Sequence, residues 1–558
     1  MGDQQDRDRT PLTESAQINR LFNSAFCDMQ DFAEQQIRQI RRLTAVGRAL
    51  SAEKNLDRLL EMILEEAQRL TNADGGTLYL TADSERELQF AFVRTDSLGL
   101  RMGGTGGRIT WPPVALFNAD GTPNHANVSA FVALSGKTVN ILDVYDAEGF
   151  NFQGTRAFDA ETGYRSKSML VVPLRNHEND IIGVLQLLNA RKAADGETVF
   201  FSQESQEITE SLASQAAVAL TNNRLIHDLE NLLEAYVRTI ATAIDEKSPY
   251  TGGHVRRVVE IAMDLAAKIN AADSGPFANI SFSKNELQEL RIAAWLHDVG
   301  KITTPEHIVD KATKLETVHD RIDLLKTRLE VIRRDHEIAV MKEYLLSKRL
   351  ALPEALAEEQ QRFSRTMNED CRFLDDVNRG GEAMSEERIR RLQGIASRSW
   401  EENGRPRPAI NEDEVRNLSI PKGTLTDEER DIVNNHAVVT AKILSQLPFP
   451  KKLSRIPDFA SGHHEHLNGT GYPLGLKGDQ LPLQTRILAL ADIFEALTAK
   501  DRPYKKGKTL SEALEILTGM VEDGHIDPDL FAFFMEKRIH LDYARRALAP
   551  QQLDTDGI

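Results

Sequence analysis

The sequence predicts a multidomain protein: an α+β domain in the amino-terminal half, a long helix in the middle and a largely helical carboxy-terminal half. The chain has 558 residues, 41% of them hydrophobic, and can therefore bury more than one core. An apolar pattern with helical spacing and several β-rich runs occupy the first part. A repeat with alternating steps of four and three residues follows, which is typical of a coiled coil.

The composition argues against several classes of protein. The formal charge of −17 opposes attachment to polymeric nucleic acid or to an acidic membrane surface, whereas a small anionic ligand is compatible with it. Cys27 and Cys371 are far apart, which argues against a disulfide framework or a thiolate metal site. The amino terminus does not resemble a secretory signal, and no apolar run reaches the roughly 18 residues of a membrane helix. We expect a cytoplasmic protein.

Residues 1–38 are polar and Gln-rich, and we expect a lead-in segment there. A helix is predicted next, because apolar residues lie on one side of it, namely Leu56, Leu59, Leu60, Ile63, Leu64 and Ala67. The runs GTLYL, KTVNILDV, SKSMLVVPL and DIIGVLQLLN predict strands. The Gly- and Pro-rich stretch 98–124 predicts an irregular loop over the sheet, where a ligand could bind.

This succession of elements resembles a GAF domain and places one at residues 39–210. The residues that carry the resemblance are Asp74, Gly75, Asp143, Lys167, Ser168, Met169, Pro173, Gly183 and Asn189. The resemblance implies a sensor domain with an unknown ligand. The nucleotide-binding motif of some relatives is matched only loosely, by Asn189, Lys192, Phe201 and Glu204. A dimerising or redundant sensor fold whose ligand is unknown is therefore favoured over a nucleotide sensor.

Residues 211–245 predict a coiled-coil signalling helix. The seam consists of positions 212, 216, 219, 223, 226, 230, 233, 237, 240 and 244, which are apolar except for Asn223 and Glu230. Polar residues in a seam fix its register, and such a helix can transmit a rotation or a sliding motion. We expect a parallel homodimer; the alternative is a single helix that packs on its own domain.

The carboxy-terminal half contains imidazoles and carboxylates whose spacing is hard to explain by core packing. They are His254, His297, Asp298, His436, His463, His464 and Asp492. Neutral imidazole and carboxylate bind divalent iron, manganese, nickel or zinc, and a carboxylate can bridge two ions. The set therefore predicts two metal ions.

The strings HDVGK, HHEHLNGTGYP and DIFEALTAKDRPYK resemble the HD-GYP phosphodiesterases, a branch of the HD superfamily. The resemblance implies an all-α domain over residues 246–550, followed by a tail at 551–558. It also implies that His254, His297, Asp298 and Asp492 form one metal site, while His436, His463 and His464 complete a second site that shares Asp298. Iron or manganese is preferred. A third ion is not expected, because Tyr250 stands where relatives with three ions have a glutamate.

The resemblance also implies catalytic and substrate-binding roles. Asp298 would be catalytic as the bridging ligand, and Lys301 would stabilise the phosphate or assist the leaving oxygen. Gly471 and Tyr472 belong to a tight loop beside the metals, in which Gly469 and Gly471 permit positive φ. Positive charge for phosphate oxygens would come from Lys301, Arg502 and Lys505.

One segment departs from the family pattern. Residues from about 313 to 418 are inserted between HDVGK and the next ligand histidine. These residues include many charged side chains and have helical spacing, which predicts a helical insertion that forms a cap or a docking surface.

The substrate that the resemblance implies is cyclic di-GMP, which would be cut to pGpG and, by a second cut, to GMP. One alternative is a phosphodiesterase for hybrid cyclic GMP-AMP, since its phosphate chemistry is the same. Another is a catalytically weak cyclic-dinucleotide receptor that acts through protein partners. Tyr250, Ala437 and the insertion favour the receptor, whereas the complete ligand set favours an enzyme.

Overall fold

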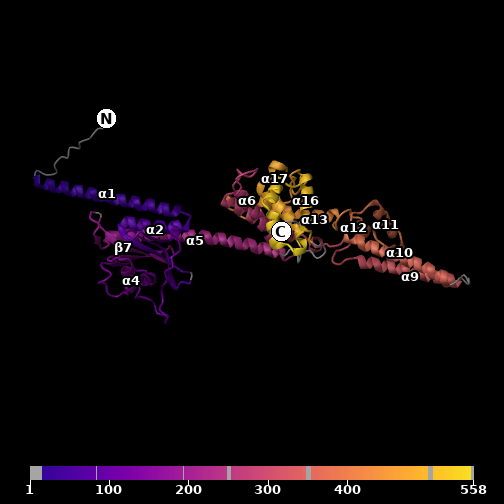
Figure 1. Ribbon diagram of the computed structural model, residues 1–558, viewed down its shortest axis with the longest axis horizontal. Coiled ribbons are helices and arrows are strands. Elements are labelled where there is room, and N and C mark those ends of the chain that lie inside the picture. Colours follow the sequence, from indigo (N-terminus) through magenta and orange to yellow (C-terminus); the bar gives the residue numbers. More distant parts are fainter. Residues whose placement is uncertain are drawn as a thin grey trace, which may run out of the picture. The chain divides into compact units, whose positions relative to one another are not determined.

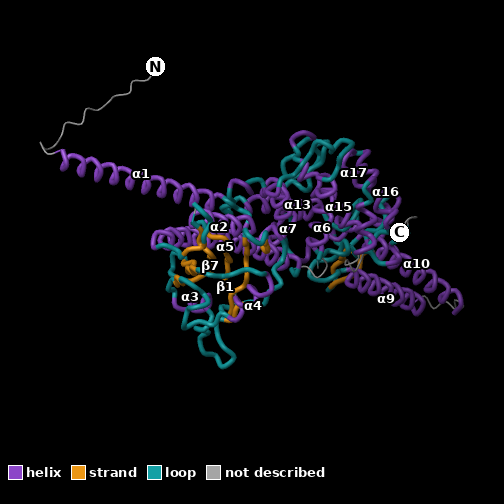
Figure 2. Tube along the Cα trace, turned by 60° about the vertical axis from the view of Figure 1, so that its left-hand side comes forward, coloured by secondary structure: helices purple, strands orange, loops and turns teal. Residues whose placement is uncertain are grey.

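The computed structural model describes residues 16–82, 84–192, 194–247, 253–346, 353–499 and 507–554. The chain divides into two compact units, Met1–Asn231 and Leu232–Ile558. The large sheet belongs to the first unit, and helices make up most of the second (Figures 1 and 2). In the described residues, no helix is long and apolar enough to cross a membrane.

The first unit is built on an antiparallel sheet with the order β3-β2-β1-β7-β6-β5. The strands of this path are β1 (Ala73–Thr81), β2 (Glu87–Thr95), β3 (Leu100–Gly103), β5 (Val139–Ile141), β6 (Met169–Arg175) and β7 (Ile181–Arg191). Short strands β4 (Val114–Ala115) and β8 (Thr198–Val199) pair with β2 and β7. The four predicted strands are confirmed, whereas β2 was not predicted, and β3 and β4 lie within the stretch predicted to be irregular.

Helices cover one face of this sheet. The predicted helical stretch forms α2 (Leu56–Thr71) and the last part of α1 (Ala16–Ala52), which begins within the segment predicted as a lead-in. Residues 53–55, which end with the N-cap residue Asn55, separate the two helices. Five of the six predicted apolar positions are buried in α2, but Leu56 is 44% exposed because it is the first residue of the helix. The other face packs against α3 (Val128–Ser135) and long loops through a second apolar cluster, and α4 (Gln153–Thr162) follows directly after Phe152 of this cluster.

The predicted signalling helix is α5 (Gln203–Asp245). Its early seam positions Leu212, Ala216 and Ala219 are buried in the core of the first unit, so this part of the seam packs within one chain. The Asn223 amide donates to the carbonyl of Lys54 in the same unit. Further along, the exposed apolar residues of α5 are Val218, Leu225, Ile226, Leu229, Leu232, Tyr236 and Ile240. The coiled-coil dimer stays a prediction.

The second unit is a helical domain, as the sequence predicts. Its main core joins α6 (His254–Asn270), α7 (Lys284–Leu296), α15 (Leu483–Thr498), α16 (Leu510–Glu522), α17 (Pro528–Glu536) and α18 (Ile539–Ala547). A second cluster joins the end of α5 to α7, α13 (Asp427–Leu444) and α14 (Ile456–Ser461). Capping boxes at Ser283, Thr426 and Thr509 fix the first turns of α7, α13 and α16.

The insertion has a core of its own. Its helices are α9 (Ile322–Leu346), α10 (Pro353–Arg379), α11 (Glu386–Ala396) and α12 (Glu412–Leu418), and α9 and α10 lie side by side (Figures 1 and 2). The predicted helices are confirmed, but the segment also contains a hairpin of β9 (Ser399–Glu402) and β10 (Arg405–Pro408), which was not predicted. At its base, the buried Lys314 ammonium donates to the carbonyls of Leu418 and Ile420.

Candidate metal centre

The seven side chains predicted to bind metal lie close together in the helical unit. His254 is the first residue of α6, His297 and Asp298 directly follow α7, and Asp492 lies in α15. His436 belongs to α13, and the pair His463 and His464 follows α14. Ligand atoms lie within 4.8 Å of one another in three overlapping groups: His254, His297 and Asp492; His297, Asp298 and His463; and His436, His463 and His464.

Asp298 lies in the middle of this arrangement. Its Oδ2 is 3.3 Å from Nε2 of His297 and 3.7 Å from Nε2 of His254. Its Oδ1 is 3.4 Å from Nε2 of His436 and 3.9 Å from Nε2 of His463. The two oxygens therefore face different histidines, which is the arrangement that a carboxylate bridging two cations requires.

Three of the histidines are held in the same way. Nδ1 of His297, His436 and His463 is 2.8, 2.6 and 2.6 Å from the carbonyl oxygen three residues earlier in its own chain segment. Donation from Nδ1 places the neutral form of each ring in the tautomer whose Nε2 can bind a metal. In the described part of the chain, these three Nε2 atoms are buried and have no hydrogen-bond partner. Buried polar atoms are rarely left in this state, so the donor set fits divalent cations.

His254 is held differently, by a residue that the sequence analysis missed. Its Nδ1 contacts the Glu495 carboxylate, and its Nε2 is 3.2 Å from Oδ1 of Asp492. Nε of Arg257 donates to the other oxygen of Glu495 at 2.5 Å. Glu495 is fully buried and lies three residues after Asp492, on the same side of α15. That spacing is the sequence feature that could have revealed it.

The acids and imidazoles perturb each other's pKa values. Burial alone would lower the pKa of His254, but Asp492 and Glu495 outweigh it and raise the pKa to about 9. Burial is likewise outweighed at His297, where Asp298 and Asp492 raise the pKa to about 10. Despite burial, the cationic neighbours Lys301 and His297 hold the pKa of Asp298 well below its usual value. The carboxylates thus stay anionic. They stabilise protons on His254 and His297, at positions where these residues could hold metal cations instead.

The other imidazoles respond in the opposite direction. Burial lowers the pKa of His436, lowers that of His464 to about 4 and holds that of His463 well below its usual value. These three rings are therefore neutral near pH 7 and can donate a lone pair without first losing a proton.

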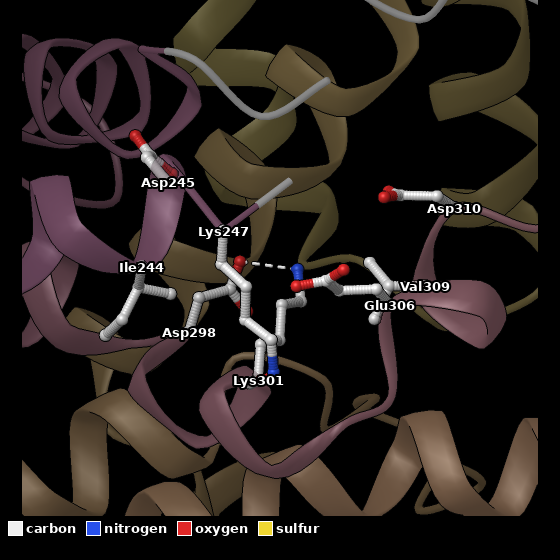
Figure 3. A pocket seen from close by; sticks show the side chains of 8 residues that line it. All are labelled: Ile244, Asp245, Lys247, Asp298, Lys301, Glu306, Val309 and Asp310. Atoms are coloured by element: carbon white, nitrogen blue, oxygen red, sulfur yellow. Dashed lines mark hydrogen bonds and ion pairs between the residues drawn. The ribbon is translucent and has the colours of Figure 1, made fainter. Parts of the chain in front are cut away.

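Lys301 lies beside the centre. It belongs to the short 3-10 helix η2 (Val299–Thr303), and its ammonium is 2.5 Å from Oδ2 of Asp298. Both residues line a hollow together with Asp245, Lys247 and Glu306, as Figure 3 shows. Lys301 is partly exposed, so the ammonium can also reach an anionic ligand in this hollow.

The glycine-rich loop after His464 lies against the same rings. The Tyr472 ring centroid is 4.7 Å from that of His464. Gly469 has a φ of 81°, as predicted, but Gly471 is not among the residues with positive φ. Gly471 is needed for close approach instead, because a Cβ there would lie 2.5 Å from Cα of Glu465. Glu465, also missed in the sequence, accepts hydrogen bonds from the backbone of Leu474 and Leu476 and holds the loop.

Three residues that the sequence analysis singled out lie outside the described residues. They are Tyr250, Arg502 and Lys505. The site is therefore built from the seven candidate ligands, Lys301, the Gly471–Tyr472 loop and the supporting Glu495.

Comparisons with known proteins agree with this architecture. A GAF-domain model matches residues 55–220, and two HD-domain models match residues 251–376 and 412–530. A 3'3'-cGAMP-specific phosphodiesterase of Vibrio cholerae is 45% identical over 121 residues, which is 21% of this chain and 25% of that protein.

Two further relatives carry the name of another cyclic dinucleotide. A probable cyclic di-GMP phosphodiesterase of Vibrio cholerae is 36% identical over 152 residues, which is 25% of this chain and 33% of that protein. A cyclic di-GMP phosphodiesterase of Pseudomonas aeruginosa is 38% identical over 114 residues, which is 20% of this chain and 26% of that protein.

The chain thus spans a quarter to a third of the length of these three relatives. The family matches, together with the arrangement of His297, Asp298 and the GYP loop, nevertheless agree on the type of each domain. The chain therefore contains a GAF domain followed by an HD region, an architecture that is consistent with an HD-GYP protein.

Proposed function

We propose that this protein is a metal-dependent cyclic-dinucleotide phosphodiesterase that cuts cyclic di-GMP to pGpG, with GMP as the product of a second cut, under the control of its GAF domain. The observation that carries the proposal is the position of Asp298, whose two oxygens face different histidines around buried Nε2 atoms without hydrogen-bond partners. The names of the relatives supply the substrate class.

In this proposal the seven clustered side chains hold two divalent ions, with iron or manganese preferred. When bound, such ions supply an activated water and neutralise the charge of the phosphate. Lys301 binds a phosphate oxygen or assists the leaving ribose oxygen, because its ammonium already lies against Asp298. Gly471 and Tyr472 form the wall on which the substrate is positioned, and Arg502 and Lys505 are proposed to add positive charge.

A second substrate is favoured by one observation. The 45% identical relative is named for 3'3'-cGAMP, so hydrolysis of a hybrid dinucleotide is the main alternative. A catalytically weak receptor is a further alternative, in which the same pocket binds the dinucleotide without turnover. A homodimer through α5 is part of the proposal, because α5 exposes several apolar side chains.

The test is turnover by the full chain reconstituted with Fe²⁺ or Mn²⁺ under reducing conditions, with cyclic di-GMP and 3'3'-cGAMP assayed side by side. We expect pGpG from cyclic di-GMP, and loss of product in Asp298→Asn. The matched control is Asp431→Asn, which changes an exposed carboxylate on α13. Preferential turnover of the hybrid would establish the alternative substrate, and bound nucleotide without product would establish the receptor.

A further inference from the structure

The end of the signalling helix is fastened to the loop that carries Asp298 and Lys301. Lys247 follows α5 by two residues, and its ammonium donates to the carbonyls of Lys301, Ile302 and Thr304 at 3.2, 2.6 and 2.8 Å. These acceptors lie at the carboxy-terminal end of η2. An ammonium has three N–H donors, one for each of these three carbonyls. Its positive charge is also favourable at the carbonyl end of a helical turn.

The turns of α5 before Lys247 pack on the helices that present the metal ligands. Val237 and Ile244 are buried in one cluster with Leu296 of α7 and Phe459 of α14. His297 directly follows α7, and His463 follows α14. Glu234 adds an ion pair with Arg291 of α7 at 2.7 Å. The end of α5 is therefore a supporting wall of the candidate metal centre.

Lys247 and the candidate catalytic pair share one hollow. Figure 3 shows the Lys247 side chain extending from the end of α5 into the space that Asp298 and Lys301 also line. The Lys301 ammonium pairs with Asp298, while the Lys301 carbonyl accepts from Lys247. A displacement of α5 therefore acts directly on the backbone of the residue that pairs with the bridging carboxylate.

We propose that Lys247 is a positioning residue that couples α5 to the metal-site loop, so that movement of α5 sets the position of Lys301 relative to Asp298. Coupling of this kind requires one structural element whose conformation is influenced from both sites, and η2 is that element here. The predicted effect on catalysis rests on the proposed function. The physical connection itself depends only on the three hydrogen bonds and the shared cluster.

The first test compares Lys247→Met, which keeps an apolar stem but removes the donors, with Lys247→Arg, which restores donors. The matched control is Lys268→Met, at an exposed lysine of α6. Hydrogen exchange in residues 299–304 should become on the order of tenfold faster in Lys247→Met, while α6 and α15 exchange as in the wild type. The kcat should fall by about tenfold or more with KM and metal content unchanged, and Lys247→Arg should recover part of it.

Two outcomes would overturn the inference. One is unchanged exchange in residues 299–304. The other is faster exchange throughout the helical unit, which would mean a general structural role. If the wild-type chain turns over no cyclic dinucleotide, the proposed function fails, but the exchange measurement still decides whether Lys247 holds the loop.

The second test addresses the coupling itself. One alanine inserted after Asp228, in the exposed part of α5, rotates the following residues by about 100° relative to the preceding ones. This insertion should change kcat in the wild-type background and have a smaller effect in Lys247→Met, because the hydrogen-bonded part of the connection is already broken. Additive effects in the two backgrounds would contradict the coupling.

Discussion

The buried Glu495 carboxylate contacts Nδ1 of His254 and lies one turn after Asp492 on the same helix. The other three buried histidines of the centre use a neutral backbone carbonyl for this purpose. His254 is thus oriented by a charged carboxylate, which makes an imidazole a more basic ligand than a carbonyl does. The candidate site that contains His254 and the one that contains His436 should therefore differ in their affinity for metal and protons.

Glu495→Gln should weaken binding at the His254 side of the centre. The amide keeps the size of the side chain but removes the charge that faces both His254 and Arg257. Loss of such a supporting carboxylate typically costs about 10- to 100-fold in metal affinity. Competition with a chromophoric chelator measures the two affinities separately.

The control for this substitution is Glu515→Gln, at an exposed position of α16. Two unchanged dissociation constants in Glu495→Gln would show that the carboxylate plays no part in binding. Equal weakening of both sites would show a general loss of structure, which thermal unfolding of the metal-free protein can detect.

The two candidate sites should respond differently to pH. The pKa values of about 9 for His254 and about 10 for His297 mean that both rings carry protons at pH 7 in the metal-free protein. A metal must displace these protons, so affinity at that site rises with pH until about pH 9 to 10. His463 and His464 have lowered pKa values and are already neutral at pH 7, so their site changes little above that pH.

Calorimetry in buffers of different ionisation enthalpy checks this prediction. We expect one ion to bind near pH 7 with little proton release, and the other to release up to about two protons. Two ions that bind with the same pH dependence would contradict the division of the centre.

Gly471→Ala should displace the loop that carries Tyr472. The new Cβ would lie 2.5 Å from Cα of Glu465 and from the carbonyl oxygen of His464, and neither backbone atom can rotate away. We expect a loss of about 1–3 kcal/mol in the free energy of unfolding, together with reduced turnover. Gly519→Ala in α16 meets no atom within 4 Å and should be neutral or slightly stabilising in the same denaturation experiment.

The candidate ligands could be predicted because short strings such as HDVGK and HHEHLNGTGYP occur in the order that is typical of a known family, and the structure brings these strings together. The supporting residues were harder to find. Glu495 could be suspected only from its three-residue spacing after Asp492 in α15. Lys247 belongs to no pattern at all, since its acceptors are backbone carbonyls more than 50 residues away. Contacts of this kind depend on tertiary packing and leave no periodic pattern.

The same distinction applies to the fold. Alternating or continuous apolar runs identified four strands of the sheet, but the hairpin β9–β10 was hidden by Pro406 and Pro408, which disfavour a strand. The seam of α5 was misplaced in part because Leu212, Ala216 and Ala219 face the core of their own unit. A spacing of three and four residues is produced equally by a core face and by a dimer seam.

The exposed stripe of α5 makes a last prediction possible. Val218, Leu225, Leu229, Leu232 and Tyr236 follow one another at steps of seven, four, three and four, one position before the predicted seam. Leu229 is 64% exposed in the single chain.

If two copies pair along this stripe, Leu229→Glu places two carboxylates against each other in the seam and should convert the dimer to a monomer in light scattering. His227→Glu, at an exposed position on the opposite side of α5, should leave the dimer intact. A wild-type chain that stays monomeric at all concentrations, or equal effects of the two substitutions, would rule out this seam.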